Sequence, residues 1–182
     1  LLNVPIKNMN KINRSKILKH PKWKMGKKIT VDSATMMNKV FEVIEAKNIF
    51  SINYKNLSIL IHSQSYVHAI VSFSDGMSKI IIHDTTMEIP IFNSIYNSAK
   101  IFDNSTKIDV KKLNDLNFQK IDNKKYPVVK ILKKLKNRNS LFETVLVSAN
   151  DELVDLKQAD RKIENLLKII YHWLSVVNYQ QF

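Results

Sequence analysis

The sequence has no cysteine and only two glycines in 182 residues. The lack of cysteine excludes disulfides, thiolate catalysis and cysteine-ligated zinc, which suits a reducing compartment. The two glycines, Gly26 and Gly76, are too few for a glycine-rich GxGxxG dinucleotide loop. No apolar run reaches the roughly 20 residues of a membrane-spanning helix, so we expect no membrane partner.

Acidic residues are also scarce, since 16 Asp and Glu face 29 Lys and Arg, giving a net charge of +13. Such an excess can attract nucleic acid, a membrane surface or a phosphorylated metabolite. The lysines are spread along a chain rich in Asn and Ile, and an AT-rich coding sequence produces the same composition without any functional role for the charge. Modules that bind nucleic acid interleave aromatic and basic side chains. No such stripe is present, so we expect no nucleic-acid partner.

Hydrophobic residues make up 45% of the chain, enough to bury a core. We predict an α+β fold: a small, largely antiparallel sheet with helices packed on one face, followed by C-terminal helices. Runs rich in β-branched residues predict strands at 28–32, 57–62, 66–73 and 78–83, with a short strand-like piece near 117–121. The Asp75-Gly76 turn predicts a hairpin between the third and fourth of these runs.

Helical spacing and start signals predict helices that begin near Met36, Pro90, Pro127 and Ser140. Ser33 or Thr35 is expected to cap the first of these helices. The resulting domains are an α+β substrate-binding domain at 1–126, completing helices at 127–156, and a diverged or truncated helical tail at 157–182.

The most informative stretch is His20–Glu45, which reads HPKWKMGKKITVDSATMMNKVFEVIE. A helix N-terminus attracts anions through its free N–H groups and its dipole. Ser33, Asn38 and Lys39 would add a hydroxyl, an amide and a cation, which together predict a phosphate cradle. The alternative is that Ser33 and Thr35 only cap the helix and that Lys39 is solvated.

Three polar residues of the same helix, Asn38, Glu42 and Glu45, follow at spacings of four and three and share a face. A carboxylate one turn beyond a phosphate cradle could hold Mg²⁺ or Mn²⁺. At least two further oxygen ligands would have to come from elsewhere. Glu42 could instead be an ordinary surface residue.

Trp23 and Met25 lie in a basic loop that could close over a substrate or pack on its own body. His20 could hydrogen-bond a ligand or simply end its segment. A second polar cluster, His62, Ser65 and His68, has no acidic partner nearby in sequence, so a hydrolase triad is unsupported. The three histidines His62, His68 and His83 could suggest a zinc site, but they lie on different predicted strands, so a structural role is the expectation.

The His20–Glu45 stretch resembles the substrate-binding signature of the 1-deoxy-D-xylulose 5-phosphate reductoisomerase family, which acts in non-mevalonate isoprenoid biosynthesis. The resemblance includes unusual residues, the Trp, the Met-Met pair and the Asn-Lys pair. It continues through IHSQSYVHAIVSFSDG, IPIFNSIY and SLFETVLVSANDELV, and covers roughly residues 3–156.

The resemblance implies a role for each matching residue. Substrate binding falls to His20, Trp23, Met25, Ser33, Asn38, Lys39 and Glu42, with Trp23 and Met25 on a closing flap. We count Glu42, Lys39 and His20 as catalytic, and Glu42 as the metal ligand. Gly26 would approach NADPH. Glu45, Ser65 and His68 would support the residues that touch the substrate.

The implied reaction rearranges 1-deoxy-D-xylulose 5-phosphate and reduces it with NADPH to 2-C-methyl-D-erythritol 4-phosphate, with Mg²⁺ or Mn²⁺ as the metal. Family membership further implies a homodimer when full length. The expected location is the cytoplasm of a bacterium or a plastid-type organelle.

The sequence also departs from the family pattern. The family's nucleotide-binding domain and its Asp-Ser-Glu metal segment have no counterpart in the 182 residues. Single departures are Val40 for Gly, Ser63 for Pro, Thr86 for an acidic residue and Asp151 for Glu. We therefore interpret the chain as a C-terminal piece of the enzyme. The alternative is a degenerate, non-catalytic basic binding module that keeps the fold.

We predict that the 182-residue chain alone does not oxidise NADPH in the presence of 1-deoxy-D-xylulose 5-phosphate and Mg²⁺. The physical reason is the missing dinucleotide loop and the two missing carboxylate ligands. The loss of NADPH absorbance measures this directly, and turnover above the protein-free rate would contradict it.

Overall fold

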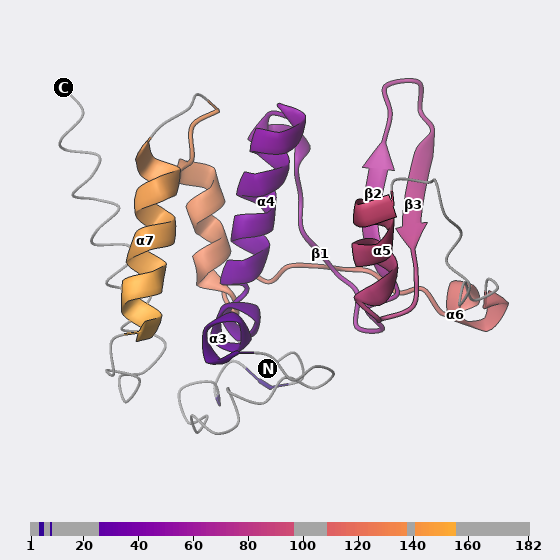
Figure 1. Ribbon diagram of the computed structural model, residues 1–182, viewed down its shortest axis with the longest axis horizontal. Coiled ribbons are helices and arrows are strands. Elements are labelled where there is room, and N and C mark those ends of the chain that lie inside the picture. Colours follow the sequence, from indigo (N-terminus) through magenta and orange to yellow (C-terminus); the bar gives the residue numbers. More distant parts are fainter. Residues whose placement is uncertain (1–3, 6–7, 9–25, 97–108, 138–140, 156–182) are drawn as a thin grey trace. The chain divides into compact units, whose positions relative to one another are not determined.

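The structure is a computed structural model that describes residues 4–5, 8, 26–96, 109–137 and 141–155 (Figure 1). The chain divides into two units, one formed by 1–59 and 121–182 and the other by 60–120. Helices and antiparallel strands are both present, which confirms the α+β prediction. The predicted tail at 157–182 lies outside the described residues, and the predicted domain boundaries stay a prediction. In the described part of the chain, none of the helices is both long and apolar enough to span a membrane.

The first unit is helical. Its elements are α3 (Lys27–Thr35), α4 (Met37–Phe50), the short 3₁₀ helix η1 (Tyr54–Asn56), the 3₁₀ helix η2 (Pro127–Lys134) and α7 (Leu141–Asp155). Helix α3 contacts α4 and α7, and η2 runs beside α4 (Figure 1). Three fully buried side chains, Val40, Ile131 and Leu146, come from α4, η2 and α7, so the core of this unit lies among these three helices.

The predicted strand at 28–32 is wrong, because this segment belongs to α3. The threonine hydroxyls satisfy helical carbonyls: Thr30 Oγ1 donates to Gly26 O at 2.8 Å and Thr35 Oγ1 to Val31 O at 3.0 Å. Lys28 and Asp32 form an i,i+4 ion pair at 3.0 Å, which only a helix permits at this spacing. Local hydrogen bonds and packing on α4 and α7 therefore override the β preference of the segment.

Helix α4 starts one residue later than predicted, because Met36 adopts a left-handed conformation with φ of 67° and separates it from α3. Met36 is the N-cap residue, so the predicted capping by Ser33 or Thr35 is wrong in its position. Thr35 still contributes, since its hydroxyl accepts the Met37 N–H at 3.4 Å. The helix ends at Phe50, and its C-cap residue Ser51 is also left-handed, with φ of 53°.

The second unit contains two antiparallel ladders among its described residues. β1 (Leu60–Ile61) pairs with β4 (Gln119–Lys120), and β2 (Val67–Ser72) pairs with β3 (Ser78–Ile82). The hairpin between β2 and β3 is confirmed, with Ser72 opposite Ser78 and Gly76 at φ of 88°, a conformation that favours glycine. The strand-like piece near 117–121 is confirmed as β4. The predicted strands are thus divided between two ladders.

The unit also carries α5 (Glu88–Tyr96) and α6 (Val110–Asn114). Helix α5 starts two residues before the predicted Pro90, because Thr86 Oγ1 accepts the Glu88 N–H at 3.2 Å and caps it. Asp109 caps α6 by accepting the N–H groups of Lys111 and Lys112 at 3.0 and 3.2 Å. Thr86, which stands at an acidic position of the family pattern, therefore has a structural use here.

A mostly buried polar contact centred on Glu143 joins helices of the first unit. Glu143 on α7 accepts hydrogen bonds from Tyr54 Oη at 2.6 Å, Asn48 Nδ2 at 3.0 Å and Lys47 Nζ at 3.2 Å. The Lys47 and Glu143 side chains are only 6% and 12% exposed. Burial on its own would raise the pKa of Glu143, but the hydrogen bonds from Tyr54, Asn48 and Lys47 outweigh it and lower the pKa.

Leu146→Ala is expected to lower the free energy of unfolding by about 2–5 kcal/mol, because it leaves a cavity at a fully buried position of α7. Val147→Ala, next to it but 39% exposed, is the matched control and should cost well under half of that. Urea unfolding of both variants measures the difference. Equal losses would contradict the position of the core.

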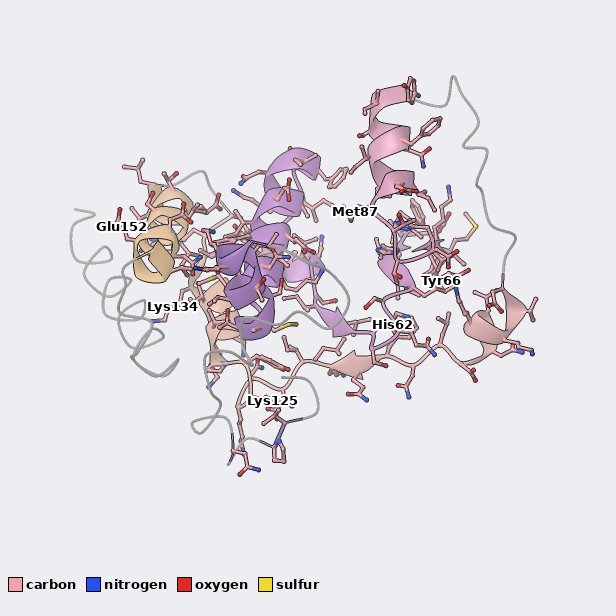
Figure 2. All side chains as sticks on the ribbon, turned by 60° about the horizontal axis from the view of Figure 1, so that its bottom comes forward. His62, Tyr66, Met87, Lys125, Lys134 and Glu152 are labelled. Carbon is pink, nitrogen blue, oxygen red and sulfur yellow. The ribbon has the colours of Figure 1, made fainter. Side chains whose placement is uncertain are left out.

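Glu143→Gln is expected to flatten the acid branch of the stability curve. Because the folded pKa lies below the ordinary value of 4.5, the stability that Glu143 contributes is complete above that pH and is lost as pH falls through the folded pKa. Urea unfolding at a series of acidic pH values tests this. Glu152→Gln, an exposed change on the same helix, should keep the wild-type profile (Figure 2), and an unchanged profile in Glu143→Gln would count against the assignment.

Candidate active site

The predicted site residues fall into three groups. His20, Trp23 and Met25 lie outside the described residues. The group in the helical unit comprises Gly26, Ser33, Asn38, Lys39, Glu42 and Glu45. The group in the 60–120 unit comprises Ser65 and His68.

Three of the predicted residues meet on the exposed side of α4. Asn38 Nδ2 donates to Glu42 Oε1 at 2.9 Å, and Lys39 Nζ lies 2.7 Å from Glu42 Oε2. The Lys39 and Glu42 side chains are 47% and 45% exposed. The prediction that Asn38 and Glu42 share a face of this helix is therefore confirmed.

An exposed ion pair of this kind contributes little to folding, about 0–1 kcal/mol. Lys39 and Glu42 can therefore exchange each other for a ligand with little loss of folding free energy. The ammonium of Lys39 and the amide of Asn38 are donors suited to a phosphate, while the carboxylate of Glu42 suits a hard divalent cation. A ligand that carried both a phosphate and a metal would separate Lys39 from Glu42 and satisfy each of them.

The donor set fits a divalent metal only in part. Glu42 offers an accessible carboxylate, and Glu45 is also exposed three residues further along α4. Across the part of the chain that the structure describes, however, His, Cys, Asp and Glu residues form no group of three or more able to hold a metal. Glu42 thus fits as one ligand, and the substrate or further residues must supply the other oxygens.

Ser33 and Gly26 lie on and before α3. Ser33 is half-buried, and its carbonyl accepts the Met36 N–H at 3.4 Å, at the end of the helix. Gly26 is exposed and is the N-cap residue of α3, and a Cβ built on it would meet none of the described residues within 4 Å. Its predicted contact with a cofactor stays a prediction.

In the 60–120 unit, Ser65 closes a turn. Its φ is 56°, and its N–H donates to His62 O at 3.1 Å. Left-handed conformations are uncommon in residues with a side chain and are concentrated at functional sites. The turn leads from β1 to β2, with His62 and Tyr66 on either side of it (Figure 2).

The histidines of this unit separate into two places. His62 stacks on Phe118 with ring centroids 5.1 Å apart, and its Nδ1 lies 3.0 Å from Asn117 O. His68 stacks on His83, with centroids 3.5 Å apart and planes 4° from parallel. The three histidines thus form no common zinc site among the described residues.

Sequence reasoning missed a buried polar contact made by Asp32, the residue before Ser33. Asp32 Oδ1 accepts Asn150 Nδ2 at 2.9 Å, Asp32 Oδ2 accepts Lys28 Nζ at 3.0 Å, and Lys28 Nζ lies 2.9 Å from Asp151 Oδ1. One signal was available, the Lys28–Asp32 spacing of four residues, but the strand prediction concealed it. The partner Asn150 is 118 residues away, and no local pattern connects it to Asp32.

Comparisons with known proteins identify the family of this chain. The model of the 1-deoxy-D-xylulose 5-phosphate reductoisomerase C-terminal domain matches residues 1–50, and that of the DXP reductoisomerase C-terminal domain matches residues 83–175. A curated 1-deoxy-D-xylulose 5-phosphate reductoisomerase from Pelagibacter ubique (strain HTCC1062) is 60% identical over 154 residues. The match covers 85% of this chain and 40% of the relative.

Solved structures give the same result. The reductoisomerase of Zymomonas mobilis in complex with NADPH superposes with a TM-score of 0.79 at 26% identity, over 95% of this chain and 45% of that one. A crystal structure of DOX-P reductoisomerase with fosmidomycin and magnesium gives 0.81 at 27% identity, over 95% and 42%. The chain thus spans less than half the length of these relatives. It belongs to the 1-deoxy-D-xylulose 5-phosphate reductoisomerase family, in the part that the C-terminal domain models describe.

Proposed function

We propose that this chain supplies the phosphate-binding face and one metal ligand of a reductoisomerase active site. The reaction is the conversion of 1-deoxy-D-xylulose 5-phosphate to 2-C-methyl-D-erythritol 4-phosphate with NADPH and Mg²⁺ or Mn²⁺. The observation that carries the proposal is the exposed contact of Asn38 and Lys39 with Glu42 on α4. NADPH and magnesium are present in solved structures of the family, which supports the choice of cofactors.

In this proposal the substrate phosphate replaces the Glu42 carboxylate as the partner of Lys39 and Asn38. Ser33 adds its hydroxyl to the same phosphate, and His20 binds the substrate beside it. The freed carboxylate of Glu42 becomes a metal ligand. A bound metal would polarise the substrate carbonyl, and the nicotinamide would supply the hydride.

The remaining predicted residues support the closed site. Trp23 and Met25 exclude water as parts of a flap, and Gly26 lets the cofactor approach the backbone. Glu45 continues the acidic face of α4 one turn beyond Glu42. Ser65 and His68, in the 60–120 unit, are proposed as supporting residues on the strength of the family pattern alone.

The full-length enzyme is proposed to be a homodimer. Apolar side chains on both faces of the β2–β3 hairpin are 39–51% exposed in the 60–120 unit, namely Ile70, Val71, Ile80 and Ile81. Exposed apolar patches of this kind mark interaction surfaces, and a second copy of the chain is the partner we propose. Sedimentation equilibrium measures this association, and a monomer at every concentration would oppose it.

A cytoplasmic location is proposed over a plastid, because the relative from Pelagibacter is bacterial.

Lys39→Ala is expected to weaken binding of 1-deoxy-D-xylulose 5-phosphate to the chain by about ten-fold or more, since a charge-assisted hydrogen bond to the phosphate is lost. Isothermal titration calorimetry measures the dissociation constant. Lys130→Ala is the matched control, because it removes the same charge from an exposed position on η2. Isotherms for Lys39→Ala that match the wild type would remove the basis of the proposal.

A further inference from the structure

Four polar side chains join α3 to α7 and form what we call the junction cluster: Lys28, Asp32, Asn150 and Asp151. Asp32 sits at its centre, with one oxygen on the Asn150 amide and the other on the Lys28 ammonium, at 2.9 and 3.0 Å. Lys28 extends the cluster to Asp151 at 2.9 Å and also lies 5.7 Å from the centre of the Phe41 ring on α4. The cluster therefore touches three helices.

Burial makes the cluster sensitive to its geometry. Asp32 and Asn150 are 3% and 1% exposed, so the carboxylate is removed from water. A buried carboxylate is tolerated only when hydrogen bonds and an opposite charge satisfy it, and loss of one partner is strongly unfavourable. Burial alone would lower the pKa of Lys28, but the hydrogen bonds to Asp151 and Asp32 outweigh it and raise the pKa. Lys28 therefore stays charged beside Asp32.

Its place in the chain connects the cluster to the candidate active site. Asp32 immediately precedes Ser33, and Phe41 immediately precedes Glu42. Helices α3 and α4 are separated only by the left-handed Met36, so the direction of Ser33 relative to Asn38 and Lys39 depends on the rotation of α3 about its axis. Apolar packing resists separation of two helices but is non-directional. The directional bonds of Asp32 can hold the rotation of α3.

We propose that Asn150, assisted by Lys28 and Asp151, is a positioning residue for substrate binding. It holds Asp32 and thereby fixes α3 so that the Ser33 hydroxyl meets the same phosphate as Asn38 and Lys39. The inference rests on the proposed function, because it assigns a role at that site. It gives α7, which carries none of the predicted substrate-binding residues, a part in recognising the phosphate.

The test is calorimetric titration of the 182-residue chain with 1-deoxy-D-xylulose 5-phosphate, which reports the dissociation constant and the binding-competent fraction separately. Asn150→Leu keeps a similar volume but removes the amide donor. It is expected to raise the dissociation constant about ten-fold, with the competent fraction unchanged. The exchange variant Asp32→Asn with Asn150→Asp restores one amide–carboxylate bond and is expected to recover most of the affinity, which a nonspecific loss of packing would not do.

Lys28→Gln provides a variant at a position that is 40% exposed and tolerates change more easily. It is expected to weaken binding in the same direction, by about three-fold. Lys27→Gln is its control, because it removes the same charge from the neighbouring exposed residue of α3. Equal effects of the two changes would mean that general charge, and not the junction cluster, affects binding.

The outcomes separate the two hypotheses. An Asn150→Leu chain that binds with the wild-type constant, or loses only competent fraction, would overturn the positioning role and leave the proposed function intact. Failure of the exchange variant to recover affinity would also count against it. A wild-type chain that does not bind the substrate would overturn the proposed function, and the positioning role with it.

Discussion

The helical unit depends on how the carboxylate of Asp32 is accommodated away from water. A charged group at 3% exposure is compatible with folding only because Asn150 and Lys28 each satisfy one of its oxygens. That requirement brings α7 against α3 and orders the N-terminal turns of α3, through Lys28. It also explains why a segment with β-branched residues is helical, since the extended alternative would place Lys28 and Asp32 too far apart to pair.

A second, mostly buried carboxylate, that of Glu143, joins helices of the same unit in a similar way. Glu143 collects donors from α4 and η1, so α7 holds the rest of the unit through two separate polar contacts. Apolar side chains such as Val40, Ile131 and Leu146 supply the bulk of the burial in between. The polar contacts specify how the helices are oriented, and the apolar contacts specify that they associate. The exposed Lys39 and Glu42 contribute little to the stability of the unit, so both can bind a ligand.

Much of this architecture could be predicted from local pattern. The hairpin at Asp75-Gly76 and the long helix near Ser140 are strong local signals, and both are present. The shared face of Asn38 and Glu42 follows from helical spacing alone. The α3 helix was missed although the Lys28–Asp32 spacing is a local helical signal, because its β-branched residues favour a strand and contacts with α4 and α7 help to override that preference. The partner of Asp32 could not be predicted, because Asn150 lies in a distant part of the chain and its local sequence carries no sign of the contact.

The left-handed residue Met36 has a consequence for how the chain can vary in length. It is the single residue between α3 and α4, and it sets the rotational phase of α4 relative to the helix before it. Because Met36 interrupts the helix, an inserted residue at this point would change how α3 and α4 are oriented relative to each other. The buried Val40 would still turn the same side of α4 to the core, so the change would appear in the direction of Ser33 relative to the exposed Glu42. The spacing across Met36, and not only the identity of its flanking residues, belongs to the specification of the site.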